Sequence, residues 1–170
     1  MNTLPKILET TSVVRFQHCD PFNHLNNAEY LNYMVNARED QLIKFYDIDI
    51  YKMGREQGKS WVVGSNQIAY LRPAYTMETI VIQTQMLAYN ETSILVEIRM
   101  YNVDKTQLKA IMWSNYVHFN LLKQRRETHS EEFMALFASV MHPEVETTFE
   151  ERIDKLKNEK GAIESNRQIG

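Results

Sequence analysis

The stretch RFQHCDPFNHLNNAEYLNYMVNARED, residues 15–40, decides how the rest of the chain can fold. Within eight residues it contains four polar side chains, those of Asp20, His24, Asn26 and Asn27. The residues before this group alternate in a way that is typical of a strand, and those after it follow a helical repeat. The sequence therefore places a carboxylate, an imidazole and two amides at one junction between a strand and a helix.

The second half of this stretch predicts the longest helix of the chain. Pro21 disfavours a helix at the preceding residue, so the chain turns there, and Asn26 can then cap a first helical turn that has Glu29 three residues later. From residue 28 to residue 46 apolar residues recur every three or four positions, which predicts an amphipathic helix of about five turns. These positions are Tyr30, Leu31, Met34, Ala37, Leu42 and Phe45. The β-branched segment over residues 11–17 predicts a strand before the junction.

Beyond residue 60 the repeat changes to two residues, the period of strands. Short, turn-like connections separate the segments, which forces neighbouring strands to be antiparallel. Only the helix over residues 28–46 is long enough to lie across such a sheet. We therefore predict an α+β architecture, in which one strand and a long central helix precede a curved antiparallel sheet that wraps around this helix. The predicted strands are residues 61–71, 79–89, 92–102 and 108–121.

The end of the chain differs in composition from this body. Residues 130–141 predict an amphipathic helix that Ser130 caps. The residues that follow are dense in charge and poor in large apolar side chains, which favours a solvated helix near residues 148–160. We predict a body over residues 1–142 and a charged C-terminal extension over residues 143–170 that is partly helical or disordered.

The composition is that of an ordinary globular protein. The chain has 170 residues, 44% of them hydrophobic and 24% charged, a length that favours one core rather than two full domains. A net charge of -3 and a pI near 6.0 give no basic field for nucleic acid. The single cysteine, Cys19, excludes an intramolecular disulfide and predicts a cytoplasmic setting. We expect no membrane span, because no segment has a run of about 18 apolar residues.

The polar side chains at the junction have two interpretations. Asp20 can simply form an Asx turn, His24 can be an ordinary loop histidine, and Asn26 already has a capping role. However, a carboxylate beside the free N–H groups of a helix N-terminus is also what acyl transfer to water requires, because those groups stabilise an oxyanion. We predict no metal site, because helical and paired ligand spacings are absent. A Cys19 nucleophile paired with His18 is disfavoured, because adjacent strand residues point to opposite faces.

Two segments carry a family resemblance. RFQHCDPFNHLNNAEYLNY (15–33), followed by NAR (36–38), and YLRPAYTMETIVI (70–82) resemble the hotdog-fold acyl-CoA thioesterases of the 4-hydroxybenzoyl-CoA thioesterase type. The shared pattern is an aspartate, a histidine four residues later, an Asn-Asn pair, a tyrosine ten residues after the aspartate, and an Arg-Pro-Ala turn before a strand. The resemblance covers about residues 10–122 and implies a hotdog thioesterase domain over residues 1–142.

The resemblance implies a role for each matched residue. Asp20 matches a catalytic carboxylate that acts on water as a general base or attacks the thioester as a nucleophile. Asn27 matches the residue whose backbone N–H, at the helix start, holds the thioester carbonyl. His24 matches a catalytic-site histidine that positions the carboxylate, the thioester or water. The predicted substrate-binding residues are Asn23, Asn26 and Tyr30.

The chain also departs from the family pattern. Asn23 stands where many members have glycine. Val35 stands where many have glutamate, which removes one carboxylate from the helix. Tyr30 and Arg38 match helix positions that we interpret as structural, and the C-terminal extension exceeds the usual body of the family.

The implied function is hydrolysis of an acyl thioester of coenzyme A or acyl carrier protein to the free acid and the thiol. No cofactor is implied other than the coenzyme A of the substrate. A non-catalytic acyl-thioester-binding protein on the same fold is the alternative, and a hotdog hydratase is a third. An exposed sheet edge and the family pattern predict a homodimer or homotetramer with the site at the interface.

Overall fold

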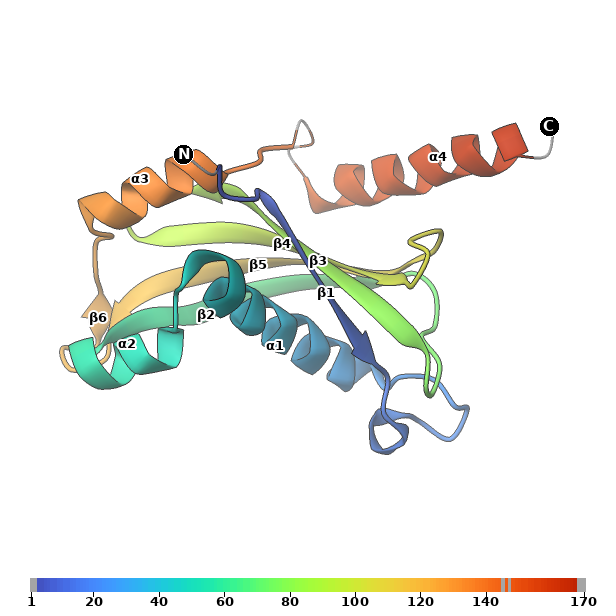
Figure 1. The fold of residues 1–170 in the computed structure, drawn as a ribbon, viewed down its shortest axis with the longest axis horizontal. Coiled ribbons are helices and arrows are strands. Elements are labelled where there is room, and N and C mark those ends of the chain that lie inside the picture. The colour runs from blue at the N-terminus through green and yellow to red at the C-terminus, as the bar shows by residue number, and fades with distance from the viewer. Residues whose placement is uncertain (1–2, 145, 147, 168–170) are drawn as a thin grey trace.

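The computed structural model describes residues 3–144, 146 and 148–167, with side chains described as far as residue 159. A strand and a one-turn 3₁₀ helix precede the long helix α1 and the short helix α2. Long strands follow, and the helices α3 and α4 end the described chain (Figure 1). This order of elements confirms the predicted α+β class.

The strands form one antiparallel sheet in the order β1-β3-β4-β5-β2, with the short β6 paired to β5. β3, β4 and β5 pair in sequence order, whereas β2 pairs with β5 at one edge and β1 pairs with β3 at the other. Along the β2 and β5 pair, Lys59 lies opposite Asn120 and Tyr70 lies opposite Ala110. The bounds are β1 Ile7–Val13, β2 Lys59–Tyr70, β3 Thr79–Tyr89, β4 Ser93–Asn102, β5 Leu108–Asn120 and β6 Arg125–Arg126.

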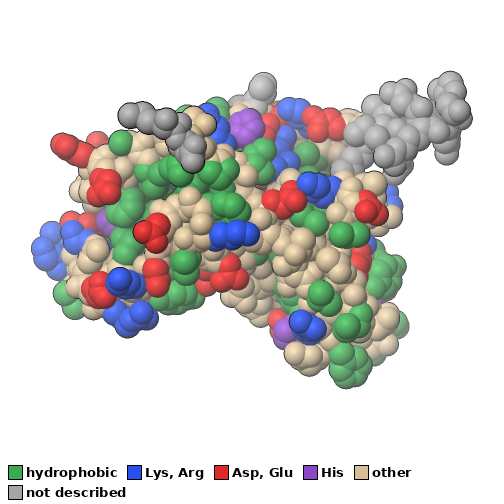
Figure 2. All heavy atoms as spheres, in the orientation of Figure 1, with side chains coloured by type: hydrophobic (Ala, Val, Ile, Leu, Met, Phe, Trp, Pro, Cys, Tyr) green, Lys and Arg blue, Asp and Glu red, His purple; other side chains and the backbone are tan. Residues whose placement is uncertain are grey.

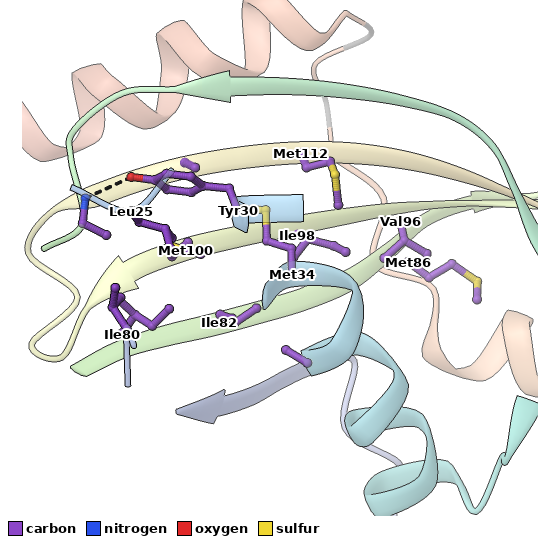
Figure 3. Close-up of a cluster of buried hydrophobic side chains, with 14 of the residues drawn as sticks. Leu25, Tyr30, Met34, Ile80, Ile82, Met86, Val96, Ile98, Met100 and Met112 are labelled. Atoms are coloured by element: carbon purple, nitrogen blue, oxygen red, sulfur yellow. Dashed lines mark hydrogen bonds between the residues drawn. The ribbon is translucent and has the colours of Figure 1, made fainter. Parts of the chain in front are cut away.

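The long helix α1, Asn27–Tyr46, lies across the inner face of this curled sheet, as predicted (Figure 1). Its inward side chains, among them Tyr30 and Met34, pack against strand residues such as Ile82 and Met112 in one buried cluster (Figure 3). Burying each apolar side chain of this size stabilises the fold by about 1.5–3 kcal/mol. The core therefore fixes which side of α1 faces the sheet.

The N-terminus of α1 has the predicted cap but not the predicted capping box. The Asn26 side chain accepts a hydrogen bond from the Ala28 N–H at 3.0 Å, as expected. The backbone N–H of Asn26 donates to the carbonyl oxygen of His18 at 2.9 Å, so the expected reciprocal bond to the Glu29 side chain is not formed. The Asn26 N–H is therefore bonded to a residue outside the helix, His18, instead of to the side chain of Glu29.

The three shorter helices flank the sheet. α2 packs against the start of β2, and its last residue is followed by Gly58 in the left-handed conformation, with φ of 64°. α3 begins at the predicted cap Ser130, packs against β3, and adds Phe137 and Val140 to the inner core. The bounds are α2 Ile50–Gln57, α3 Glu131–Val140 and α4 Phe149–Arg167.

The first strand lies earlier in the chain than the sequence predicts. The strand expected over residues 11–17 is Ile7–Val13, because the chain turns into a 3₁₀ helix at Phe16–His18. The β-branched composition runs through Val14, beyond the end of the strand, so it does not locate the turn.

The C-terminal helix α4 packs on the outer face of the sheet at its beginning and extends past it (Figure 1). Phe149 and Leu156 join Trp113 of β5 in an outer apolar cluster. The guanidinium of Arg152 donates to both carboxylate oxygens of Glu97 on β4, each at 2.8 Å. The prediction of a solvated helix is therefore wrong for this part of the extension.

Candidate active site

Asp20 lies in a tight loop between the 3₁₀ helix and α1. Its Oδ1 atom accepts hydrogen bonds from the backbone N–H groups of Phe22 at 2.9 Å and His24 at 3.0 Å, which is an Asx turn. The N–H of Asp20 itself donates to the carbonyl oxygen of His24 at 2.7 Å. The loop thus holds the carboxylate through one oxygen, and among the described residues no hydrogen-bond donor is bound to the other, Oδ2.

The same loop returns to the start of α1. The bond from the Asn26 N–H to the His18 carbonyl closes the loop around Asp20. Asn27 is an exposed residue, and its N–H has no acceptor within the described part of the chain. The carbonyl oxygen of Asn27 accepts from the Tyr70 hydroxyl at 3.0 Å. An open N–H at a helix N-terminus carries partial positive charge and can stabilise an oxyanion.

The connection between β2 and β3 supports this junction. The Ala74 N–H donates to the Tyr30 hydroxyl at 2.9 Å (Figure 3), and the Leu25 N–H donates to the Ala74 carbonyl at 2.8 Å. Tyr30 is buried, with 2% of its surface exposed. Its hydroxyl therefore joins α1 to the Arg-Pro-Ala turn, and its predicted contact with substrate stays a prediction.

The loop also sets the positions of Asn23 and His24. Asn23 has φ of 67°, a left-handed conformation that asparagine adopts more readily than most side chains, which explains how it can replace a glycine. The His24 ring meets the Tyr75 ring edge to face, with 5.2 Å between centroids. Both residues lie in the loop of Asp20, but no described hydrogen bond joins the His24 ring to the Asp20 carboxylate.

The loop protrudes from the body of the molecule and carries hydrophobic side chains at its tip (Figure 2). Phe16 and Phe22, on either side of Asp20, are each 78% exposed. Val62 and Val63 of the edge strand β2 are also exposed. Exposed apolar side chains at a loop tip and on an edge strand are typical of surfaces that another molecule covers.

An apolar cavity at the other end of α1 was not predicted. Its volume is about 90 Å³, and it lies between the C-terminal half of α1, the neighbouring strands and α3. Hydrophobic side chains gather at the surface between α3 and the end of α1 (Figure 2). Two polar residues of its wall are Arg38 on α1 and Tyr116 on β5. Apolar lining residues include Leu42, Tyr46, Trp61, Met86, Ile94 and Phe137.

Helical spacing alone could have grouped Val35, Arg38 and Leu42 on one side of α1. The sequence does not show that strand residues leave an open space opposite them. The described residues contain no group of three or more His, Cys, Asp or Glu side chains placed to hold a metal ion. None of the described helices is long and apolar enough to cross a membrane.

Comparison with known proteins identifies a family. The model of the thioesterase-like superfamily matches residues 14–137. The long-chain acyl-CoA thioesterase FadM of Escherichia coli is 31% identical over 86 residues, which make up 51% of this chain and 63% of FadM. The match therefore spans less than two thirds of the length of this relative.

Solved structures show the fold. YbaW, a probable thioesterase from Escherichia coli, aligns with a TM-score of 0.67 at 24% identity, over 79% of this chain and 99% of YbaW. SAV2348 from Staphylococcus aureus, in complex with CoA, aligns with a TM-score of 0.72 at 13% identity, over 88% of this chain and 93% of its own. These likenesses confirm the predicted hotdog fold. Because the family model matches the chain from the end of β1 into α3, this protein belongs to the thioesterase-like superfamily.

Proposed function

We propose that this protein is a thioesterase that hydrolyses an acyl thioester of coenzyme A to the free acid and the thiol. One observation carries the proposal. A closed loop fixes the Asp20 carboxylate through Oδ1 and leaves Oδ2 open, and the same loop leads into the open N–H of Asn27. Hydrolysis of a thioester needs these two groups, a base or nucleophile and an oxyanion donor.

The chemistry follows from these groups. The Asn27 N–H polarises the thioester carbonyl and stabilises the oxyanion that forms when the carbonyl carbon is attacked. Asp20 either takes a proton from the attacking water or attacks the carbon itself and forms an acyl anhydride, which water then cleaves. Both routes expel the thiolate and end in the free acid. We assign His24 to orienting the carboxylate, the thioester or the water.

The exposed amides beside the loop are the proposed substrate contacts. Asn26 uses its side-chain oxygen as the helix cap, so its NH₂ group remains available to a substrate. Asn23 is exposed at the tip of the same loop. Tyr30 supports these contacts from the core through Ala74.

Coenzyme A is the proposed carrier of the acyl group. The name of FadM, an acyl-CoA thioesterase, and the CoA complex of SAV2348 support this choice over acyl carrier protein. We propose no cofactor beyond the coenzyme A of the substrate. A cytoplasmic setting stays a prediction.

We propose that two copies of the chain associate along the edge of β2. The free edge of this strand offers unpaired backbone groups, and its residues Val62 and Val63 are exposed although they are apolar. The tip of the Asp20 loop is also exposed and apolar. Association would cover both surfaces and complete the site, and a pair of such dimers would give a tetramer.

The test is the variant Asp20→Asn, assayed with a thiol reagent on short-chain, long-chain and aromatic acyl-CoAs. We expect thiol release to fall by about 10²–10⁴, because the amide can neither accept a proton nor attack. Binding of a non-hydrolysable acyl-CoA analogue should stay close to that of the unchanged protein. The matched control is Asp40→Asn, which removes an exposed carboxylate on α1 and should leave the rate unchanged.

Two outcomes would contradict the proposal. If the unchanged protein binds an acyl-CoA but releases no thiol from any of the panel, the protein is a non-catalytic acyl-thioester binder. If it adds water to an enoyl-CoA and leaves the thioester intact, it is a hydratase.

A further inference from the structure

The cavity contains a buried cation without an anionic partner. Arg38 is 4% exposed, and its Nη1 atom donates to the Thr84 hydroxyl at 3.1 Å. Among the described residues no other acceptor bonds to its guanidinium, and no carboxylate lies within ion-pair distance of it. Burial accordingly lowers the pKa of Arg38 from its ordinary value. A buried charge without a counter-ion is unfavourable, so an anion that reached Arg38 would gain from pairing with it.

A second polar group of the cavity wall is also unpaired. The hydroxyl of Tyr116 is buried and forms no hydrogen bond of normal geometry in the part of the chain that the structure describes, although Ser114 is close enough to lower its pKa. Burial raises the pKa of this phenol, so at neutral pH it is a proton donor. Arg38 and Tyr116 are close enough to influence each other electrostatically. Arg38, whose described hydrogen bond goes to Thr84, and Tyr116 thus border one cavity whose remaining lining is mostly apolar apart from Glu39.

We propose that this cavity binds the far end of the acyl group, and that this end carries a carboxylate which Arg38 and Tyr116 recognise. The proposal rests on the proposed thioesterase function and names its substrate class, an acyl-CoA whose chain ends in a second carboxyl group. A guanidinium and a phenol supply the geometry and the number of donors that a carboxylate accepts. The apolar walls take the chain that leads to it.

The position of Arg38 on α1 fits this substrate. Asn27, Leu31, Val35 and Arg38 follow one another at intervals of three or four residues, so they lie on one side of the helix. The helix rises about 1.5 Å per residue, which places Arg38 roughly 16 Å from the N–H of Asn27. A thioester carbonyl at Asn27 and a carboxylate at Arg38 would therefore be the two ends of one extended chain along α1.

The carboxylate of Glu39 does not pair with Arg38 in the way proposed for the substrate carboxylate. Glu39 also borders the cavity, but its Oε2 atom accepts a hydrogen bond from the Tyr51 hydroxyl at 2.7 Å on the exposed side of α1. A free fatty acid has the same chemistry as the proposed chain end, an apolar chain with one carboxylate. The test must therefore separate a substrate that spans both sites from a fatty acid that fills the cavity alone.

The test compares two acyl-CoAs of equal chain length, one ending in a carboxylate and one in a methyl group. We expect kcat/KM to be higher for the carboxylate. Arg38→Met should lower kcat/KM for this substrate about 10- to 100-fold, and Tyr116→Phe about 3- to 10-fold, while the methyl-ended substrate changes little. Arg38→Lys should restore part of the preference because it keeps the charge. The control Tyr89→Phe changes a half-buried strand tyrosine outside the cavity lining and should keep the preference.

Three results would overturn the proposal. The first is an equal preference for both chain ends in the unchanged protein and in Arg38→Met. The second is competitive inhibition by free fatty acids that Arg38→Met abolishes, together with no preference among the acyl-CoAs. The third is a preference that survives in both variants.

The proposed function can fail separately. If no thiol is released, binding of thioether analogues with the two chain ends is measured by calorimetry instead. Tighter binding of the carboxylate-ended analogue that Arg38→Met removes would support the cavity assignment although the hydrolase assignment had failed. Equal binding of the two analogues would overturn the cavity assignment as well.

Discussion

Two arginines, one on each face of the sheet, are buried to nearly the same extent but in opposite electrostatic surroundings. Arg152 on the outer face is 3% exposed, and Arg38 on the inner face is 4% exposed. Carboxylates surround the first, and none of the described ones contacts the second. Arg152 therefore holds two parts of the chain together, whereas the charge of Arg38 is open to a ligand.

The guanidinium of Arg152, on the outer face, has several carboxylate partners. Besides its two bonds to Glu97, Arg152 contacts Glu144 at 3.0 Å and Glu146 at 3.6 Å. Burial opposes the charge, but hydrogen bonds and the attraction of these carboxylates outweigh it and raise the pKa of Arg152. Glu97 is completely buried and also accepts from the Trp113 indole at 2.9 Å. This network ties α4 to β4 and β5.

The largest expected effect is on stability when this network loses Arg152, which leaves Arg99 Nε, 3.3 Å from Glu97, as the remaining cation beside that carboxylate. Arg152→Met leaves the Glu97 carboxylate buried without its main partner, so we expect the free energy of unfolding to fall by about 3–5 kcal/mol. Urea unfolding followed by tryptophan fluorescence measures the change. Lys155→Met is the control on the same helix, where the half-exposed ammonium pairs with Glu146, and it should be close to neutral. A loss for Arg152→Met no larger than that of the control would mean that the outer network is not what anchors α4.

Lowering the pH should have a smaller effect on stability. The loss should occur near the cavity and not on the outer face of the sheet. His118 and His129 stack with 5.1 Å between their centroids beside Trp61 and α3, and Trp61 Nε1 donates to His129 Nε2 at 3.0 Å. Burial lowers the pKa of both rings from the ordinary 6.5. The unfolded chain therefore binds more protons than the folded chain just below pH 6.5, so stability is full above this pH and falls as the pH drops below it.

Hydrogen exchange between pH 8 and pH 5 measures this effect. Amides of α3 should lose protection on acidification, after correction for the intrinsic exchange rate, whereas amides of α4 near Arg152 should keep theirs. His142→Gln is the control, because it removes a histidine outside the stack. Equal losses in α3 and α4 would show that acid does not distinguish the two faces.

The smallest effect on stability is expected for Arg38→Met. No described carboxylate is left without a partner by this change, so the free energy of unfolding should alter by less than about 1 kcal/mol or should rise. The same urea titration used for Arg152→Met gives the comparison directly. A loss as large as that of Arg152→Met would mean that Arg38 is a structural cation, and it would remove the contrast between the faces.

The sequence predicts those features that neighbouring residues determine. The cap of α1 at Asn26, its helical repeat, and the pairing of β3, β4 and β5 all depend on short spacings, and the structure confirms them. The position of β1 was wrong because a 3₁₀ turn interrupts a composition that still favours a strand. The capping box failed because His18, outside the helix, took the N–H of Asn26.

Features that join distant residues were not predictable. The contact of Arg152 with Glu97 gives a charged C-terminal helix a buried side, which no local pattern indicates. At the candidate site, the family resemblance points to Asp20 and Asn27, but only the structure shows which of their atoms remain open. The sequence did not predict that Arg38 and Tyr116 border one cavity, because the space between α1 and β5 depends on how distant segments pack.

The pairing of β2 with β5 has a consequence for synthesis of the protein. Lys59 lies opposite Asn120, and at roughly 5–20 residues per second a ribosome needs several seconds to pass from one to the other. During this interval α1 and β2 have been synthesised but lack the strand that completes the sheet beneath them. A translational pause before β5 would prolong the exposure of their apolar side chains, so codon choice in this interval should influence how much of the nascent protein aggregates.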